Sequence, residues 1–194
     1  MKVLTTQELI ASTHSLLALL RNKNVATFLQ VLCASLFIGL CAQIKIVLPF
    51  SPVPITGQTF GVILVGALLG SRKGALAALC YLFEGSLGLP VWAGGAAGFW
   101  HLLGPTGGYR FAYPLQAFLA GYSLEKMSFG FFRILTAFFL ICCLHLTIGS
   151  LWLAHFVGWD RCFLLGLYPF IGVDFVKALI MAVYLKVKKC SVSA

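Results

Sequence analysis

The 194 residues are 60% hydrophobic and 10% charged, whereas a soluble domain carries about 25% charged residues, so the composition excludes an ordinary soluble domain. A helix needs about 20 residues to cross a bilayer, so this length accommodates about six spans and no second domain. The net charge of +9 is explained by basic residues retained beside membrane spans, and no basic patch interleaved with aromatic residues occurs in a polar context. We therefore predict an all-α integral membrane protein and expect no nucleic-acid partner.

Residues 1–24 form the one markedly polar stretch of the chain. Their leucines recur at roughly helical spacing, and Thr5 and Glu8 have the spacing of a capping box, in which each side chain satisfies a free backbone amide at a helix start. We predict an amphipathic N-terminal extension that forms a short interfacial helix. A cleaved signal peptide is not expected, because the stretch lacks a basic start followed directly by an unbroken apolar core and a small-residue cleavage site.

Residues 25–188 contain six hydrophobic stretches, which we predict to form a six-helix membrane domain, followed by a cytoplasmic tail at residues 189–194. The spans are expected at about Val25–Leu48, Ile55–Gly70, Ala75–Leu89, Tyr109–Leu124, Phe129–Phe156 and Phe163–Leu185. Because proline cannot donate the helical hydrogen bond, the proline-rich turn of residues 49–54 should end the first span and Pro90 the third. Residues 91–108 are too rich in glycine for a spanning helix. They are expected to form a re-entrant or lid segment, which is tolerated in a membrane protein where it is buried or lines a cavity.

The distribution of basic residues predicts that both termini are cytoplasmic. With that orientation, ten of the fourteen Lys and Arg residues lie on or near the cytoplasmic side. These are Lys2, Arg21, Lys23, Arg72, Lys73, Lys126, Arg133, Lys186, Lys188 and Lys189. Lys45, Arg110 and Arg161 fall toward the outside, as the positive-inside rule expects of a multi-pass protein of the cell membrane. An external ligand would then enter a cavity roofed by residues 91–108.

Asp174 and Lys177 form an ionisable pair within the last predicted span. Three positions separate them, so both project from the same helix face. Counted from Leu167 at about 1.5 Å per residue, they lie roughly 10 Å and 15 Å below the outer boundary, too deep for either to reach water. A charge at the bilayer centre costs about 2.5–3.5 kcal/mol, and such residues normally mark a substrate or ion path. We predict a binding role; a mutually neutralised pair that holds helices together is the alternative.

A few further polar side chains occur in the spans and in the loop. Gln58 and Glu84 could line the same cavity, although each could instead cap a helix or tie two helices together. His101, His145 and His155 are assigned structural or interfacial roles, because no carboxylate accompanies them at metal-ligand spacing. The seven cysteines lie almost all inside apolar runs, where cysteine behaves as a small hydrophobe, so we expect neither a disulfide framework nor a metal site.

The sequence carries no catalytic pattern. It lacks a Walker A segment, a nucleophile elbow and an HExxH motif. The glycine-rich residues 104–108 resemble a phosphate loop only in composition, because no Lys-Ser or Lys-Thr follows them. We therefore expect no enzymatic activity and no resident cofactor. If transport requires ATP, another subunit must supply the ATPase.

Four sequence blocks are specific enough to indicate a family. They are AQIKIVLPFSPVPITGQTF at residues 42–60, GLPVWAGGAAG at 88–98, GPTGGYR at 104–110 and YPFIGVDFVKA at 168–178. In this order they cover about residues 26–188, and the chain resembles the BioY family, the biotin-binding S components of energy-coupling factor (ECF) transporters. The resemblance implies a six-helix protein that binds biotin in a pocket open to the outside, beneath the first and third external connections.

The resemblance also implies roles for particular residues. Asp174 and Lys177 match the family's Asp-x-x-Lys and would hold the polar groups of biotin, whose ureido ring offers two N–H donors and one carbonyl acceptor. Gln58 matches the glutamine that follows the Pro-Val-Pro-Ile block. Gly94 and Gly95 match the loop that closes over the ligand.

Two more residues, Tyr109 and Glu84, complete the set that we predict at the substrate site. The chain also departs from the family pattern at two positions. Ala96 stands where relatives can carry a polar residue, so one hydrogen bond to the ligand is expected to be missing or replaced, and Gly57 stands where a larger apolar residue is common. These departures affect individual contacts and leave the predicted substrate unchanged.

The implied partners are a transmembrane coupling subunit and two cytoplasmic ATPase subunits. Ser35 and Gly39 on the first helix have a small-xxx-small spacing, typical of close helix approach in lipid, and are the candidate docking face.

Two other classes of protein stay open. One is a self-contained proton-coupled carrier for biotin or another small acid, in which Asp174 and Lys177 titrate, although no inverted repeat is evident. The other is a membrane enzyme that uses this pair and Glu84 as acid and base groups, although it would lack a nucleophile or metal set.

Overall fold

The computed structural model describes residues 22–127 and 130–192. Its elements are α2 (Lys23–Gln43), β1 (Lys45–Ile46), β2 (Ile55–Thr56), α3 (Gln58–Leu69), α4 (Ser71–Ser86), the 3₁₀ helix η1 (Phe99–Leu102), α5 (Gly107–Lys126), α6 (Phe131–Val157), α7 (Trp159–Gly166) and α8 (Tyr168–Val192). Apart from two strands of two residues each, the elements of this part of the chain are helical, which confirms the predicted all-α architecture. Residues 1–21, most of the predicted N-terminal extension, lie outside the described residues.

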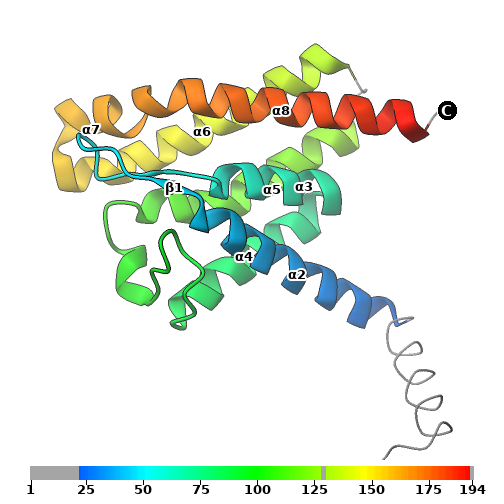
Figure 1. Ribbon diagram of the computed structural model, residues 1–194, viewed down its shortest axis with the longest axis horizontal. Helices are drawn as coiled ribbons and strands as arrows, with labels where there is room; N and C mark the ends of the chain where they lie inside the picture. Colours follow the sequence, from blue (N-terminus) through cyan, green and yellow to red (C-terminus); the bar gives the residue numbers. More distant parts are fainter. Residues whose placement is uncertain (1–21, 128–129, 193–194) are drawn as a thin grey trace, which may run out of the picture.

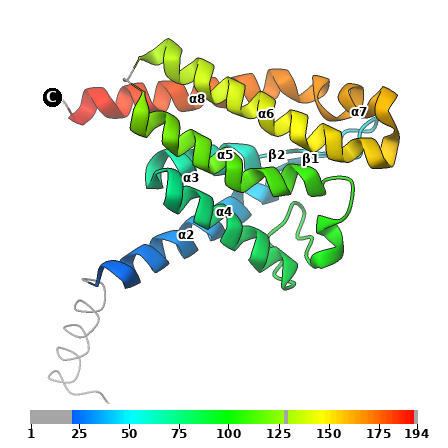
Figure 2. The same ribbon diagram turned by 180° about the vertical axis from the view of Figure 1, so that it is seen from behind.

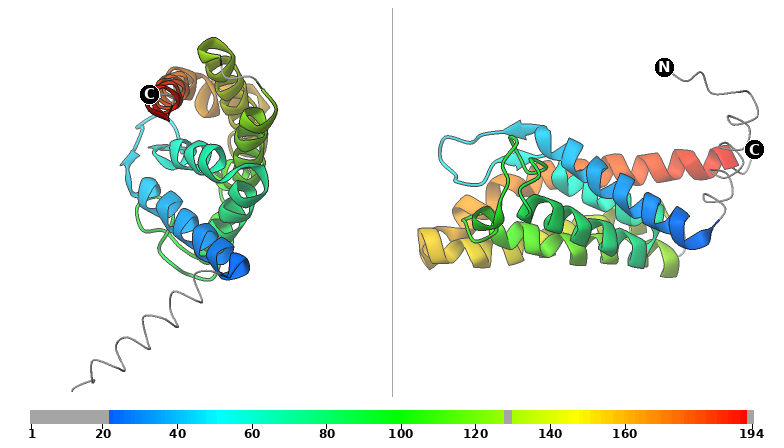
Figure 3. Two further views of the ribbon diagram at one scale, coloured as in Figure 1. Left: turned by 90° about the vertical axis from the view of Figure 1, so that its right-hand side faces the viewer. Right: turned by 90° about the horizontal axis from the view of Figure 1, so that it is seen from below.

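The helices form one elongated bundle (Figure 1). Helices α4, α5 and α6 lie side by side (Figure 2), α8 packs on α6, and α2 packs on α3 and α4. Viewed along the bundle, α3 lies in the middle, with α2 and α4 on one side and α6 and α8 on the other (Figure 3). The start of α2 and the end of α8 lie at one end of the bundle, whereas the hairpin, the glycine-rich loop and α7 lie at the other (Figure 1). We refer to this second end as the loop end.

The central position of α3 follows from its sequence, QTFGVILVGALL, which is apolar on all sides beyond its first two residues and therefore favours burial all round. Close packing depends on Gly66, because a Cβ there would overlap the carbonyl oxygen of Ala117 in α5. At the end opposite the loop end, Glu125 accepts hydrogen bonds from the backbone N–H of Ser71 at 2.7 Å and from its hydroxyl at 2.9 Å. These bonds cap the start of α4 and lower the pKa of the Glu125 carboxyl.

Three stretches of the described residues are helical, long and apolar enough to cross a membrane: Lys23–Gln43, Phe131–Val157 and Trp159–Lys188, the last of which joins α7 to most of α8. The other helices are shorter or more polar. Helices α3 and α4 have 12 and 16 residues, which at about 1.5 Å per residue is less than the roughly 30 Å hydrocarbon core. The bundle thus has a helix at each of the six predicted positions, and three of these meet the criteria for a span.

The first helix is shorter than the sequence predicts. It ends at Gln43 rather than at Leu48, because the chain turns there into an antiparallel pair of strands, β1 and β2. The proline-rich turn is therefore the connection between the two strands and does not end the helix. Its position is fixed by Ser51, whose hydroxyl donates to the carbonyl oxygen of Leu165 at 2.7 Å.

The last predicted span is two helices rather than one. The sequence predicts a single span from Phe163, but α7 ends at Gly166 and α8 begins at Tyr168. Pro169 explains the break, because proline lacks the N–H of a continuous helix and is tolerated in the first turn of a new one. Helix α8 then continues to Val192, so residues 189–192 extend it.

Candidate functional site

A cavity near the loop end encloses about 490 Å³ of space between the protein atoms, part of it open to solvent. Its lining comes from the hairpin, the glycine-rich loop, its junction with α5, and helices α3, α5, α6 and α8. The lining residues are Val53, Pro54, Thr56, Gln58, Thr59, Ala93, Thr106, Tyr109, Arg110, Tyr113, His145, Leu146, Phe170, Asp174 and Lys177. Among the described helices, α2 and α4 contribute no residue to this lining.

Asp174 and Lys177 lie in the cavity wall as an ion pair, as their spacing predicts. The Nζ of Lys177 lies 2.8 Å from Oδ1 of Asp174 and also donates to Oγ1 of Thr59 at 2.5 Å. Asp174 is 2% exposed, and its second carboxylate oxygen, Oδ2, has no hydrogen-bond partner among the described residues. An ammonium has three N–H donors, so one donor of Lys177 remains after these two bonds. The pair therefore offers one free acceptor and one free donor for a ligand.

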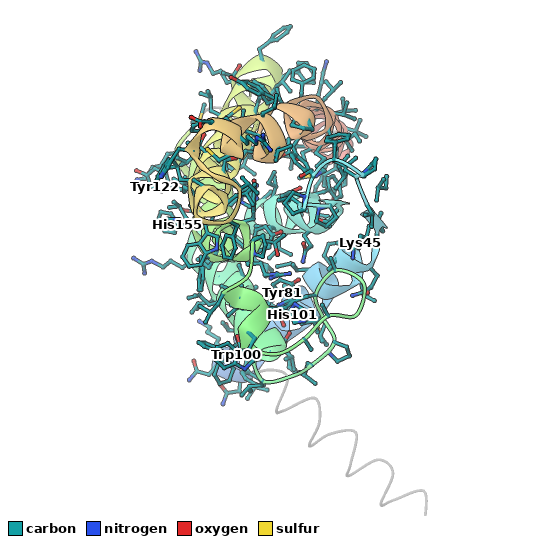
Figure 4. The ribbon with its side chains drawn as sticks, turned by 90° about the vertical axis from the view of Figure 1, so that its left-hand side faces the viewer. Lys45, Tyr81, Trp100, His101, Tyr122 and His155 are labelled. Atoms are coloured by element: carbon teal, nitrogen blue, oxygen red, sulfur yellow. The ribbon has the colours of Figure 1, made fainter. Side chains whose placement is uncertain are left out.

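Gln58, the first residue of α3, lines the cavity and also joins neighbouring elements. Its Nε2 donates to the hydroxyl of Tyr81 on α4, while its Oε1 accepts from the hydroxyls of Tyr113 on α5 and Thr56 on β2, each at 3.1 Å. Figure 4, a view onto the loop end, shows Tyr81 in the interior of the bundle. Because Nε2 carries two N–H groups, one of them remains for a ligand. Both roles considered for Gln58 from the sequence are therefore compatible with its position.

Arg110 is a site residue that the sequence interpretation missed. It is 7% exposed, donates to the carbonyl oxygen of His101 at 2.5 Å, and its guanidinium lies 4.6 Å from the centre of the Trp92 ring. No acidic side chain of the described residues lies within ion-pair distance of it. A guanidinium stays charged in proteins, so the cavity contains a buried cation without a carboxylate partner. The available signal was the GPTGGYR block that ends at Arg110, but its position at the start of a span led us to count it as an ordinary outer charge.

His145 on α6 and Tyr113 on α5 form an aromatic wall of the cavity. Their rings are stacked with centroids 5.1 Å apart and planes 6° apart, and Nδ1 of His145 has no partner among the described residues. The sequence assigned His145 only a structural or interfacial role, whereas the structure places it in the lining.

Tyr109 also lines the cavity, as predicted, but its hydroxyl donates to the carbonyl oxygen of Gly166 at 2.8 Å. Tyr109 is therefore positioned to offer its ring to a ligand rather than its hydroxyl.

The glycine-rich loop forms another wall of the cavity through Ala93. Trp92 is fully buried and lies directly over Gly85 of α4, where any Cβ would overlap the indole. The predicted residues Gly94 and Gly95 do not line the cavity themselves. They have φ values of 74° and 72°, a left-handed conformation that glycine adopts readily, and they form the turn that brings Ala93 to the wall.

Glu84 is not brought to the cavity, which corrects its predicted place at the substrate site. It is buried on α4 and accepts a hydrogen bond at 2.7 Å from the hydroxyl of Ser35 on α2. The reason is the orientation of α4, which packs Glu84 against α2 and supplies no residue to the cavity lining. Glu84 instead ties two helices together, which was the alternative role considered for it.

The predicted docking face on the first helix is also corrected. Ser35 is fully buried by its contact with α4, and Gly39 is buried against Val91 of the glycine-rich loop. Their small-xxx-small spacing therefore serves packing within this chain. The side chains that α2 exposes are large and apolar and include Leu36 and Leu40.

The fold and the site together define a class of protein. The described chain is an all-helical membrane protein that holds, near one end of its bundle, a small-molecule cavity with an ion pair and an unpaired arginine in its walls. The chain belongs to the BioY family, whose family model matches residues 12–192.

Individual relatives agree with the family match. The chain is 44% identical to the probable biotin transporter BioY of Pyrococcus horikoshii, over 77% of this chain and 89% of the relative. It is 34% identical to the biotin transporter BioY of Thermotoga maritima, over 75% and 86% of the two chains. It is also similar to the crystal structure of the S-component for biotin from an ECF-type ABC transporter, with a TM-score of 0.77 and 29% identity over 87% of this chain and 94% of that one. The resemblance seen in the sequence blocks is thereby confirmed.

Proposed function

We propose that this chain takes up biotin as the substrate-capturing membrane subunit of an ECF-type transporter, and that the cavity near the loop end is its biotin site. The family, the relatives named as biotin transporters and the similar S-component support this function. The observation that carries the proposal is the combination of charges in one cavity. The Asp174–Lys177 pair and the unpaired Arg110 line the same cavity.

The chemistry of biotin matches the two polar regions. Its ureido ring offers N–H donors to the free Oδ2 of Asp174 and a carbonyl acceptor to the remaining N–H of Lys177. Its carboxylate is an anion that Arg110 can bind with two parallel hydrogen bonds. The apolar parts of the ligand would contact side chains such as Leu146 and Phe170 between these regions.

The proposal includes the arrangement in the membrane. The chain would cross the cell membrane six times, with residues 25–188 as the membrane domain, both termini in the cytoplasm and the loop end outside. The helices at all six predicted positions, the basic residues near the end opposite the loop end, and the location of the start of α2 and the end of α8 at that same end support it. Transport energy would come from partner subunits, a transmembrane coupling subunit and two cytoplasmic ATPases, while this chain itself binds biotin without catalysis.

Equilibrium binding of biotin to the purified chain in detergent tests the site. The wild-type protein should bind biotin saturably, and a Lys73→Gln variant at the opposite end of the bundle should bind with an affinity within about twofold of wild type. Absence of binding by the wild-type chain would refute the biotin proposal.

Uptake of labelled biotin by cells with and without a coupling module tests the partners, because uptake should require the ATPase. Equal uptake without it would favour a self-contained carrier.

A further inference from the structure

The turn of residues 92–95, which we call the wall turn, determines the shape of one side of the cavity. Ala93 in this turn lines the cavity, and the Trp92 ring supports the guanidinium of Arg110. Movement of Ala93 away from the lining would therefore open the cavity on this side.

One side chain outside the cavity joins both ends of the wall turn to a helix. Nε2 of Gln43, the last residue of α2, donates to the carbonyl oxygen of Trp92 at 3.3 Å and to that of Gly39 at 3.0 Å. Oε1 of Gln43 accepts from the backbone N–H of Gly95 at 3.1 Å. The N–H of Gly95 also lies 3.0 Å from the carbonyl oxygen of Trp92, which closes the turn. Gln43 thus uses its donor and its acceptor on one short segment.

The surroundings of Gln43 indicate that its hydrogen bonds to the wall turn can break and re-form. Its side chain is exposed, and so are Gly94 and Gly95, so water can replace the bond from the Gly95 N–H at small cost, while the two bonds donated by Nε2 are partly buried. Lys45, which Figure 4 shows at the margin of the loop end, lies beside Gly94. The other end of the wall turn is fixed more firmly, because Trp92 is fully buried against α4. Residues 93–95 are therefore the part of the loop that can swing, with Trp92 as its fixed point.

We propose that Gln43 is a positioning residue that fastens the wall turn to α2 and thereby sets how fast biotin enters and leaves the cavity. The inference rests on the proposed biotin site. Gln43 does not line the cavity, so its bonds favour the closed turn without adding a contact to the ligand. Gln43 makes the same bonds whether the cavity is empty or occupied. It therefore shifts the balance between the closed and the open wall turn without changing the affinity for the ligand. Its loss should accelerate association and dissociation by the same factor and leave the Kd unchanged.

A Gln43→Met variant tests the proposal, because methionine has a similar length and cannot make these hydrogen bonds. Gln30→Met is the matched control: Gln30 is on the same helix, its side chain accepts one hydrogen bond from Lys73 at 2.9 Å, and it is 13 positions away from Gln43. Stopped-flow and filter-release experiments with labelled biotin give both rates. For Gln43→Met both rates should rise about fivefold with Kd within about twofold of wild type, as expected for the loss of weak, partly exposed hydrogen bonds. Gln30→Met should leave both rates unchanged.

Two results would overturn the proposal: unchanged rates in Gln43→Met, or a weaker Kd with an unchanged association rate, which would make Gln43 part of the binding wall. Hydrogen exchange provides a readout that needs no ligand. The backbone N–H groups of residues 91–98 should exchange several times faster in Gln43→Met than in Gln30→Met, while those of α8 should not change. Equal exchange in the two variants would overturn the fastening even if the wild-type chain failed to bind biotin, so the two proposals can fail separately.

Discussion

The two charged regions of the cavity are built in opposite ways. On the α8 side, Lys177 is neutralised by Asp174 and held by Thr59. On the α5 side, Arg110 is held by a backbone carbonyl oxygen and an aromatic ring, and no carboxylate of the described residues balances its charge. Both regions lie in the wall of the same cavity and are largely shielded from solvent, so the difference between them is one of chemistry.

This difference indicates what each region can bind. A neutral pair with one free acceptor and one free donor suits a neutral group that has both N–H and C=O, and it would gain little from an added charge. An unpaired guanidinium suits an anion, because a buried charge is costly until it is compensated. A ligand with a ureido ring at one end and a carboxylate at the other meets both requirements.

The largest expected effect comes from breaking the pair. Asp174→Asn leaves the ammonium of Lys177, which is only 14% exposed, without a counter-charge, which should reduce the free energy of unfolding by about 2–4 kcal/mol. It should also weaken biotin binding by more than about 100-fold, because an acceptor for an N–H group is lost. Thermal unfolding in detergent and equilibrium binding measure the two effects.

A double variant serves as the control for this prediction. Asp174→Asn combined with Lys177→Met removes the isolated charge, so most of the stability should return while biotin binding stays weak. Normal affinity in the double variant would show that the pair only holds helices together.

Arg110→Met should weaken biotin binding while changing the stability of the protein far less than Asp174→Asn does. Biotin affinity should fall by about 30- to 100-fold, because charge-assisted hydrogen bonds to the carboxylate are lost. The free energy of unfolding should change by less than about 1 kcal/mol, since removing an unbalanced buried charge offsets the lost contacts with His101 and Trp92. A loss of stability as large as that of Asp174→Asn would mean that the two regions do not differ as described.

Tyr81→Phe probes the hydrogen bonds that position Gln58 between the two regions. The change leaves one N–H of the Gln58 side chain without its partner, which should cost about 1–3 kcal/mol of stability and weaken biotin binding about fivefold. Tyr122→Phe is the matched control, because Tyr122 is exposed near the margin of the bundle in Figure 4. Equal behaviour of the two variants would exclude a role for this network.

The smallest effect is expected at Glu84, which lies outside both regions. Glu84→Gln retains an oxygen that can accept from the hydroxyl of Ser35, so biotin affinity should stay within about twofold of wild type. Binding titrations with the purified variant measure this. A loss above about tenfold would return Glu84 to the site, where the sequence interpretation first placed it.

The sequence was informative where a local rule applied. Two charges three positions apart in an apolar helix share a face whatever the fold, so Asp174 and Lys177 were predicted as a pair without knowledge of their neighbours. The six helical positions follow from hydrophobic length in the same way. Pro169 carried a local signal as well, but it was not used, and the break between α7 and α8 was missed.

The features that the sequence did not predict depend on tertiary contacts. Glu84, like Asp174, is a carboxylate in an apolar helix, and the sequence did not show that the packing of α4 on α2 keeps it away from the cavity. Arg110 is one of several basic residues near helix ends, and only the position of Trp92 and His101 shows that it is buried. The hairpin was missed because strands of two residues are too short to carry a periodic pattern.

A ligand comparison tests the central claim most directly. Biotin methyl ester keeps the ureido ring but lacks the carboxylate, so its affinity relative to biotin reports on the anion-binding region alone. Wild type should bind the ester about 30-fold more weakly than biotin, whereas Arg110→Met should bind both compounds within about threefold of each other. A 30-fold preference for biotin that persists in Arg110→Met would contradict the assignment of the carboxylate to Arg110 and, with it, the division of the cavity into two regions.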